Sequence, residues 1–94
     1  MTAALLHEPI ENGVILSHGI MTIGRGKINE MSIALPTVSH QHARIVTFNK
    51  AAYIQDLEST NGTYVNNKKI TYHRLHIGDH VQVGEYTFNI VEIQ

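Results

Sequence analysis

The sequence contains no cysteine, so it can form neither a disulfide framework nor a thiolate metal site. It also lacks any apolar run approaching the roughly 18 residues that a membrane-spanning helix needs. Residues 1–6 include no basic residue ahead of their short apolar run, unlike a secretory signal peptide. These absences lead us to expect a soluble, cytoplasmic protein with no membrane partner.

An excess of positive charge is missing as well. Seven Lys and Arg stand against eight Asp and Glu, which gives a formal net charge of −1 at pH 7 with His neutral. Non-specific nucleic-acid binding depends on a basic surface, so we expect no nucleic-acid partner. One local cationic pocket is still compatible with this charge. Ninety-four residues are enough for a single domain with a modest core, and we expect that domain to span residues 1–94.

Proline occurs only twice, and no long helical periodicity is present. Instead, short runs rich in Val, Ile, Thr, Tyr and Phe are separated by Gly, Asn and Asp, as in β-proteins. The expected strands cover residues 3–7, 14–16, 20–23, 31–33, 43–48, 52–57, 63–65, 68–70, 81–83 and 86–90. Turn signals follow at Asn49-Lys50, Asn66-Asn67 and Gly84-Glu85. Ten or eleven short strands with this spacing predict an all-β fold, a two-sheet sandwich.

Three polar stretches interrupt this strand pattern, at residues 23–25, 37–43 and 56–66. The last contains Asn61-Gly62, the dipeptide best able to adopt positive φ in a tight turn. A simple hairpin loop would explain that stretch if it stood alone. Together, however, the three stretches offer a fixed cation, hydroxyls and an amide, which is the chemistry of a phosphate-binding loop cluster.

These residues resemble the forkhead-associated (FHA) domain family over about residues 23–84. The resemblance rests on an ordered set of motifs: Gly24-Arg25, Asn29, residues 38–43, residues 56–63, Val65-Asn66, Gly78-Asp79 and Val83-Gly84. It implies an eleven-stranded β-sandwich whose loops at one end bind phosphothreonine peptides, with threonine preferred over serine. The implied partners are proteins phosphorylated by a Ser/Thr protein kinase, or the kinase itself. The resemblance implies a binding module, not an enzyme, and no cofactor.

The resemblance also assigns roles to single residues. It implies that Arg25 contacts the phosphate, that Ser39 and Thr60 add hydroxyl groups, and that Asn61 holds the peptide backbone. A guanidinium group suits the first role because it is always charged and can grip a phosphate through two donors. Each residue also has an ordinary interpretation, as a solvated arginine or as turn residues.

Three further residues are expected to support the site rather than touch the ligand. Gly24 would let the chain bend after a strand, and Gly62 would relieve the tight turn. The resemblance implies that His42 is buried and props up the binding loops through hydrogen bonds.

Two parts of the sequence depart from the usual FHA pattern. His40 stands where Arg or Lys is common, and Ala34-Leu35 replaces an acidic pair before the proline. The loss of one fixed cation should weaken phosphate binding by about 0.5–2 kcal/mol. We still include His40 among the expected phosphopeptide-binding residues.

Several other functions fit the sequence less well. Residues 24–27 lack the later glycine and the βαβ unit of a dinucleotide site. His40 and His42 are the only close histidine pair, and no nearby carboxylate completes a metal shell, so we expect no metal. A hydrolase built on Ser39 and His42 would lack a nucleophile elbow.

A second kind of protein interaction fits the sequence better than these three functions do. The domain could act as a phospho-independent assembly subunit that binds through a sheet face. Exposed apolar side chains would mark that face, and Leu35 and Ile77 are the candidates in the sequence.

Overall fold

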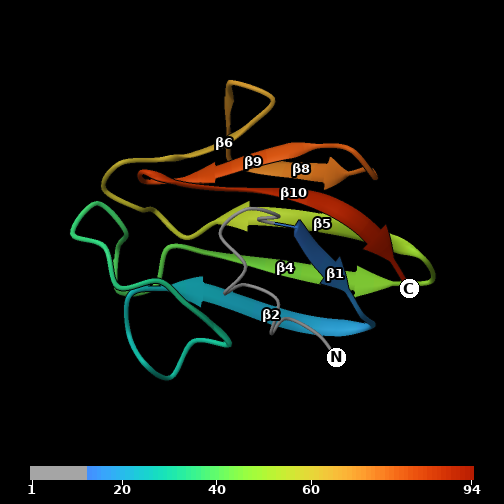
Figure 1. Ribbon diagram of the computed structural model, residues 1–94, viewed down its shortest axis with the longest axis horizontal. Coiled ribbons are helices and arrows are strands. Elements are labelled where there is room, and N and C mark those ends of the chain that lie inside the picture. The colour runs from blue at the N-terminus through green and yellow to red at the C-terminus, as the bar shows by residue number, and fades with distance from the viewer. Residues whose placement is uncertain (1–12) are drawn as a thin grey trace.

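The computed structural model describes residues 13–94 and forms two packed β-sheets (Figure 1). The first sheet has the strand order β1-β10-β9-β6-β7, and the second has the order β3-β2-β4-β5-β8. The strands are β1 (Gly13–Leu16), β2 (Gly19–Gly24), β3 (Met31–Ser32), β4 (Ala43–Phe48), β5 (Ala51–Asp56), β6 (Thr63–Val65), β7 (Lys68–Ile70), β8 (Tyr72–Leu75), β9 (His80–Val83) and β10 (Tyr86–Ile93). The predicted all-β sandwich is confirmed.

The core lies between the sheets and is built from alternate residues of the strands. In β4, for example, residues 43, 45 and 47 are buried while residues 44 and 48 are exposed. Phe88 is the largest fully buried side chain of the described part, and branched aliphatic residues surround it. This alternation is the period-2 pattern that a half-buried antiparallel strand requires.

Most predicted strands are found within one or two residues of their expected bounds. Strand β10 differs more, since it runs to Ile93, three residues beyond its predicted end. Strand β8 was not predicted, because three of its four residues are exposed and, within residues 13–94, it is an edge strand paired with β5 alone. The expected strand over residues 31–33 shortens to Met31–Ser32. The strand expected over residues 3–7 lies outside the described residues.

The predicted hairpin turns are present. Asn49 and Lys50 have φ values of 54° and 62°, and Asn66 and Asn67 have values of 52° and 70°. Two consecutive residues of positive φ give the turn twist that matches antiparallel strands. At the third turn, Gly84 has φ of 61° and joins the paired residues Val83 and Tyr86.

The turns and strand directions gather several loops at one end of the sandwich, on the left in Figure 1. They are the loop after β2 (residues 25–30), the loop between β3 and β4 (residues 33–42), the loop between β5 and β6 (residues 57–62) and the β9–β10 turn. Within residues 13–94 there is no helix of the length and apolarity needed to cross a membrane.

Candidate functional site

The loop after β2 and the loop before β4 are joined through their backbones. The amide of Arg25 donates to the carbonyl of Ser39 at 2.8 Å, and the amide of Gly26 donates to the carbonyl of His40 at 3.2 Å. The buried side chain of Asn29 adds two bonds, from Nδ2 to the carbonyl of Gly26 at 2.8 Å and to that of His40 at 2.9 Å. Arg25 therefore projects from a loop whose position is fixed against residues 39 and 40.

Gly24 is required at this junction because the two loops approach so closely. A Cβ atom on Gly24 would overlap the carbonyl oxygen of His40 and would also press on Nδ2 of Asn29. Its φ does not lie in the left-handed region. The supporting role expected for Gly24 thus has a different physical reason from a bend, namely the close approach of two backbones.

His42 is fully buried and hydrogen-bonds to groups in three segments. Its Nδ1 accepts the amide N–H of Ser39 at 3.0 Å. Nε2 therefore carries the ring proton and donates to the carbonyl of Gly62 at 2.8 Å. The His42 backbone also accepts from the amide of Leu57 and donates to the carbonyl of Ile23. One neutral ring and its backbone thus hold β2, the Ser39 loop and the Gly62 turn together.

Asp56 organises the loop between β5 and β6, and we did not single it out in the sequence. Its Oδ1 accepts the hydroxyls of Ser59 at 2.6 Å and Thr63 at 2.7 Å, and Oδ2 accepts the amide of Ser59 at 3.1 Å. Burial raises the pKa of Asp56, but the hydrogen bonds from Ser59 and Thr63 hold it below its usual 3.8. The Asp-x-x-Ser spacing was the signal that could have revealed this role, because an Asp side chain can accept from a backbone N–H three residues later, as it does at a helix N-cap.

Gly62 closes the same turn. Its amide donates to Oγ of Ser59 at 2.9 Å, and its φ is 88°. This conformation suits glycine and agrees with the turn predicted from the sequence. The side chains of Tyr64 and Lys69 lie against it, each 3.2 Å from the position that a Cβ atom would take.

Ser39 and Thr60 meet at the surface of the loop cluster. The amide of Thr60 donates to Oγ of Ser39 at 3.0 Å. Ser39 is half-buried and Thr60 is exposed. Within the described part of the chain, the Ser39 hydroxyl donates to no other group, so its hydrogen can point to a ligand.

Asn61 is exposed and anchored through one half of its amide. Its Nδ2 donates to the carbonyl of Thr37 at 2.8 Å, and Oγ1 of Thr37 in turn accepts the amide of Glu85 at 2.9 Å. Oδ1 and the second N–H of Asn61 stay available, which is one acceptor and one donor for a peptide backbone.

Arg25 and His40 complete the exposed surface of the cluster. Nδ1 of His40 lies 2.9 Å from the position that a Cβ of Gly26 would take, so the ring covers the Arg25 loop. Over residues 13–94 the one ion pair joins His76 and Asp79, so no carboxylate neutralises Arg25 there. The structure therefore brings all five expected binding residues into one set of hydrogen-bonded loops, with the three expected supporting residues buried beneath them.

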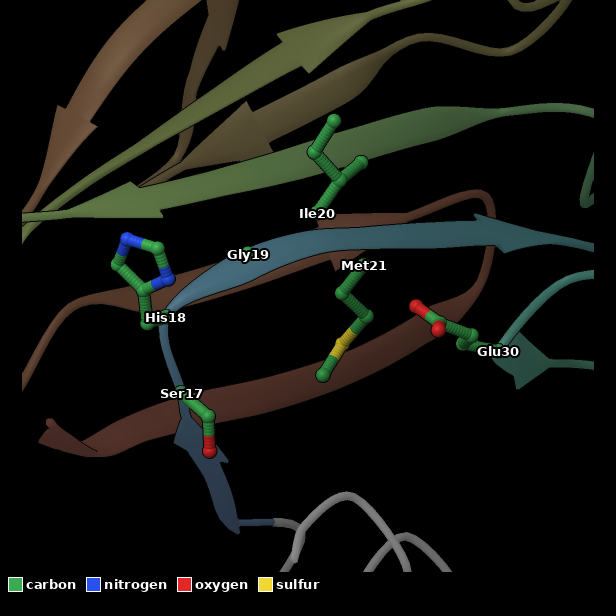
Figure 2. A pocket seen from close by; sticks show the side chains of 6 residues that line it. All are labelled: Ser17, His18, Gly19, Ile20, Met21 and Glu30. Carbon is green, nitrogen blue, oxygen red and sulfur yellow. The ribbon is translucent and has the colours of Figure 1, made fainter.

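Figure 2 shows a pocket elsewhere, lined by Ser17, His18, Gly19, Ile20, Met21 and Glu30. None of the expected site residues lines it. The candidate site is instead formed by exposed and half-buried loop residues. Among the described residues, no cluster of His, Asp or Glu has the arrangement of a metal site.

Comparison with known proteins identifies the family. The FHA domain model matches residues 21–84, which is more than half of the chain. Over 72 residues the chain is 33% identical to the glycogen accumulation regulator GarA of Mycobacterium tuberculosis, covering 77% of this chain and 44% of GarA. The chain thus spans less than half the length of that relative.

Comparison with solved structures leads to the same family. One from a study of phosphothreonine-dependent FHA domain interactions matches with a TM-score of 0.74 at 33% identity, covering 77% of this chain and 75% of that chain. The FHA domain of the CT664 protein from Chlamydia trachomatis matches with a TM-score of 0.78 at 25% identity, covering 86% and 83%. The chain belongs to the FHA domain family.

Proposed function

We propose that this domain binds phosphothreonine-containing proteins in Ser/Thr kinase signalling, through the loops at residues 25, 39–40 and 60–61. The observation that carries the proposal is that Arg25, un-neutralised among the described residues, lies on a loop bonded through its backbone to Ser39, whose hydroxyl hydrogen is free. His42 holds the Ser39 loop in place. The membership in the FHA family and the phosphothreonine-dependent interactions studied for a related structure support it.

The chemistry follows from the ligand's charge. A phosphothreonine carries about −1.5 to −2 charges at pH 7 and three acceptor oxygens. Arg25 supplies a paired donor, and the Ser39 and Thr60 hydroxyls supply further donors. Asn61 then pairs with the peptide backbone through its free acceptor and donor, which adds affinity without reading side chains.

The same geometry supports a binding module without catalysis. Nδ1 of His42 accepts the backbone amide of Ser39 and not its hydroxyl, and Oγ of Ser39 faces the amide of Thr60. His42 is therefore not placed to remove a proton from the Ser39 hydroxyl as a general base would. We also propose a single domain over residues 1–94, since the described strands form one sandwich. A cytoplasmic location, which we propose as well, fits partners that are phosphorylated by Ser/Thr kinases.

The test is calorimetric titration of the domain with one peptide in three forms: phosphothreonine, phosphoserine and unmodified threonine. We expect binding to the first, weaker binding to the second and none to the third. Equal binding of the modified and unmodified peptides would overturn the proposal.

A further inference from the structure

The outer face of the β3-β2-β4-β5-β8 sheet is formed by alternate residues that register across the strands. Ile20, Val46, Tyr53 and Arg74 are successive cross-strand neighbours, and Thr22, Arg44, Gln55 and Tyr72 form the next row. Figure 2 shows Ile20 and Met21 pointing to opposite sides of β2, with Met21 on the side that packs against the core. We call these two rows, with Phe48 of β4, the outer face.

The outer face exposes large apolar and aromatic side chains. Ile20 is 56% exposed, Phe48 60% and Tyr72 62%. The rings of Tyr53 and Tyr72 stack with centroids 5.5 Å apart and an interplanar angle of 9°, which presents a flat aromatic surface. Apolar side chains gathered in this way on one face are typical of an interaction surface. Of the two residues expected to mark such a face, Leu35 instead packs against the core, and Ile77 is exposed but precedes β9.

The charged side chains in the two rows of the outer face are both positive. Arg44 and Arg74 are both exposed, and Nε of Arg44 donates to Oε1 of Gln55 at 2.9 Å. Neither arginine forms an ion pair with the described residues, and neither row contains a carboxylate. The nearest carboxylate in sequence, Asp56 at the end of β5, is engaged by Ser59 and Thr63 in the loop cluster. Glu30 borders the face, and its backbone amide donates to Oγ1 of Thr22 at 3.1 Å.

We propose that the outer face is a second docking surface, which takes an acidic segment of a partner protein that also carries aliphatic or aromatic side chains. Carboxylates would pair with Arg44 and Arg74 while apolar side chains cover Ile20, Phe48 and Tyr72. Four strands spaced by about 4.8 Å span roughly 15 Å, enough for about five residues of extended peptide. This surface is separate from the phosphate-binding loops and does not depend on the proposed function.

Two other occupants fit the face less well. A second copy of the chain would bring the same two arginines and no carboxylate to a symmetric contact. A nucleic acid could stack on the tyrosines, but its backbone requires several cations along its track, and this chain has a formal net charge of −1.

The test uses an unphosphorylated peptide in which Glu alternates with Leu and Phe, titrated into isotope-labelled domain and followed by amide NMR. We expect shifts on β2, β4, β5 and β8, and about fivefold to tenfold weaker binding to the Arg44→Glu/Arg74→Glu variant. Lys68→Glu, a charge reversal of an exposed lysine on β7, is the matched control and should bind normally. Phe48→Ala should also weaken binding, and phosphothreonine peptide should bind all variants alike.

Four results would overturn the proposal. They are no binding of the acidic peptide, equal binding of a peptide with Lys in place of Glu, shifts confined to the loops at residues 25–42 and 57–62, and self-association of the free domain that Tyr72→Ala abolishes. An oligo-dT strand that displaces the acidic peptide from the same face would assign the surface to nucleic acid instead. Melting curves of each variant show whether the fold is retained.

Discussion

At the residue scale, the loop cluster divides its residues by burial. Arg25, His40, Thr60 and Asn61 are exposed and Ser39 is half-buried, whereas His42 has no exposed surface. The exposed side chains can exchange their bound water for a ligand with little change in folding stability. Substitution of the buried ring instead leaves the amide of Ser39 and the carbonyl of Gly62 without their partners. Changes in the two groups should therefore separate loss of binding from loss of stability.

Arg25→Ala should remove most phosphopeptide affinity, because it deletes the one Arg or Lys among the five expected binding residues. A charged hydrogen-bonded contact of this kind corresponds to a loss of roughly 1.5–3 kcal/mol. The melting temperature should stay close to that of the wild type, since the side chain is exposed. Calorimetry with a phosphothreonine peptide measures both affinities, and Lys68→Ala serves as the charge-loss control. Unchanged affinity in Arg25→Ala would refute the phosphate-binding role.

His40→Arg should tighten phosphopeptide binding, because it places a fixed cation on the exposed surface next to Ser39. The gain should be about 0.5–2 kcal/mol, as for one partly exposed charged contact. Calorimetric titration of both proteins at pH 8 measures it, and wild-type affinity in His40→Arg would place this side chain away from the phosphate.

At the scale of elements, the loop between β5 and β6 owes its shape to one glycine and one carboxylate. Gly62→Val should destabilise the domain by roughly 1–3 kcal/mol, because a β-branched residue is strained at φ of 88°. Its Cβ would also crowd Tyr64 and Lys69. Gly78→Ala is the control for backbone strain without crowding, because Gly78 has φ of 98° and no atom lies within 4 Å of its Cβ position. It should destabilise the domain less than Gly62→Val. Urea denaturation compares the variants, and a wild-type midpoint for Gly62→Val would contradict the turn geometry.

Asp56 should give the domain a component of acid sensitivity. Its pKa is lower in the folded state than its usual 3.8, so the stabilisation is present above that pH. It is lost as the pH falls from about 3.8 through the folded value. Asp56→Asn should lose about 1–2 kcal/mol at pH 7 and should show a flatter stability profile in this acid range. Urea unfolding at a series of pH values checks this, with the exposed Glu92→Gln as control; parallel profiles for Asp56→Asn and wild type would disprove it.

At the scale of the whole molecule, ligand binding and folding are coupled because the loops that form the site also cross-link the two sheets. The β3–β4 loop belongs to one sheet and the β9–β10 turn to the other, and Thr37 bonds to Glu85 between them. A ligand that holds these loops should therefore stabilise the entire domain.

A phosphothreonine peptide at a hundredfold excess over its Kd should stabilise the folded state by about 2.7 kcal/mol. For a domain of this size the melting temperature should rise by roughly 10 °C or more. Differential scanning calorimetry measures the shift, and the unphosphorylated peptide should produce none. At the same peptide concentration, Arg25→Ala should reduce the shift to about half or less; a full shift in that variant would place the phosphate elsewhere.

The sequence by itself was sufficient for features set by local residue order. Alternating apolar residues predicted most strands, paired residues such as Asn66-Asn67 predicted turns, and motif spacing predicted the family. It also singled out Arg25, Ser39 and Asn61, whose shared position at one end of the sandwich the structure shows. Each of these signals is made by residues that are close together in the sequence or at a fixed spacing, so it can be recognised from residue order alone.

Other features were decided only by tertiary structure, because they depend on which distant segments meet. The need for glycine at position 24 comes from the carbonyl of His40, sixteen positions later in the chain. The tautomer of His42 is set by its bonds to Ser39 and Gly62, and strand β8 exists because its exposed residues pair with the edge of β5. The outer face likewise forms only when β2, β4, β5 and β8 come into register. Local propensity cannot encode these contacts, since each is created by packing between residues that are far apart in sequence.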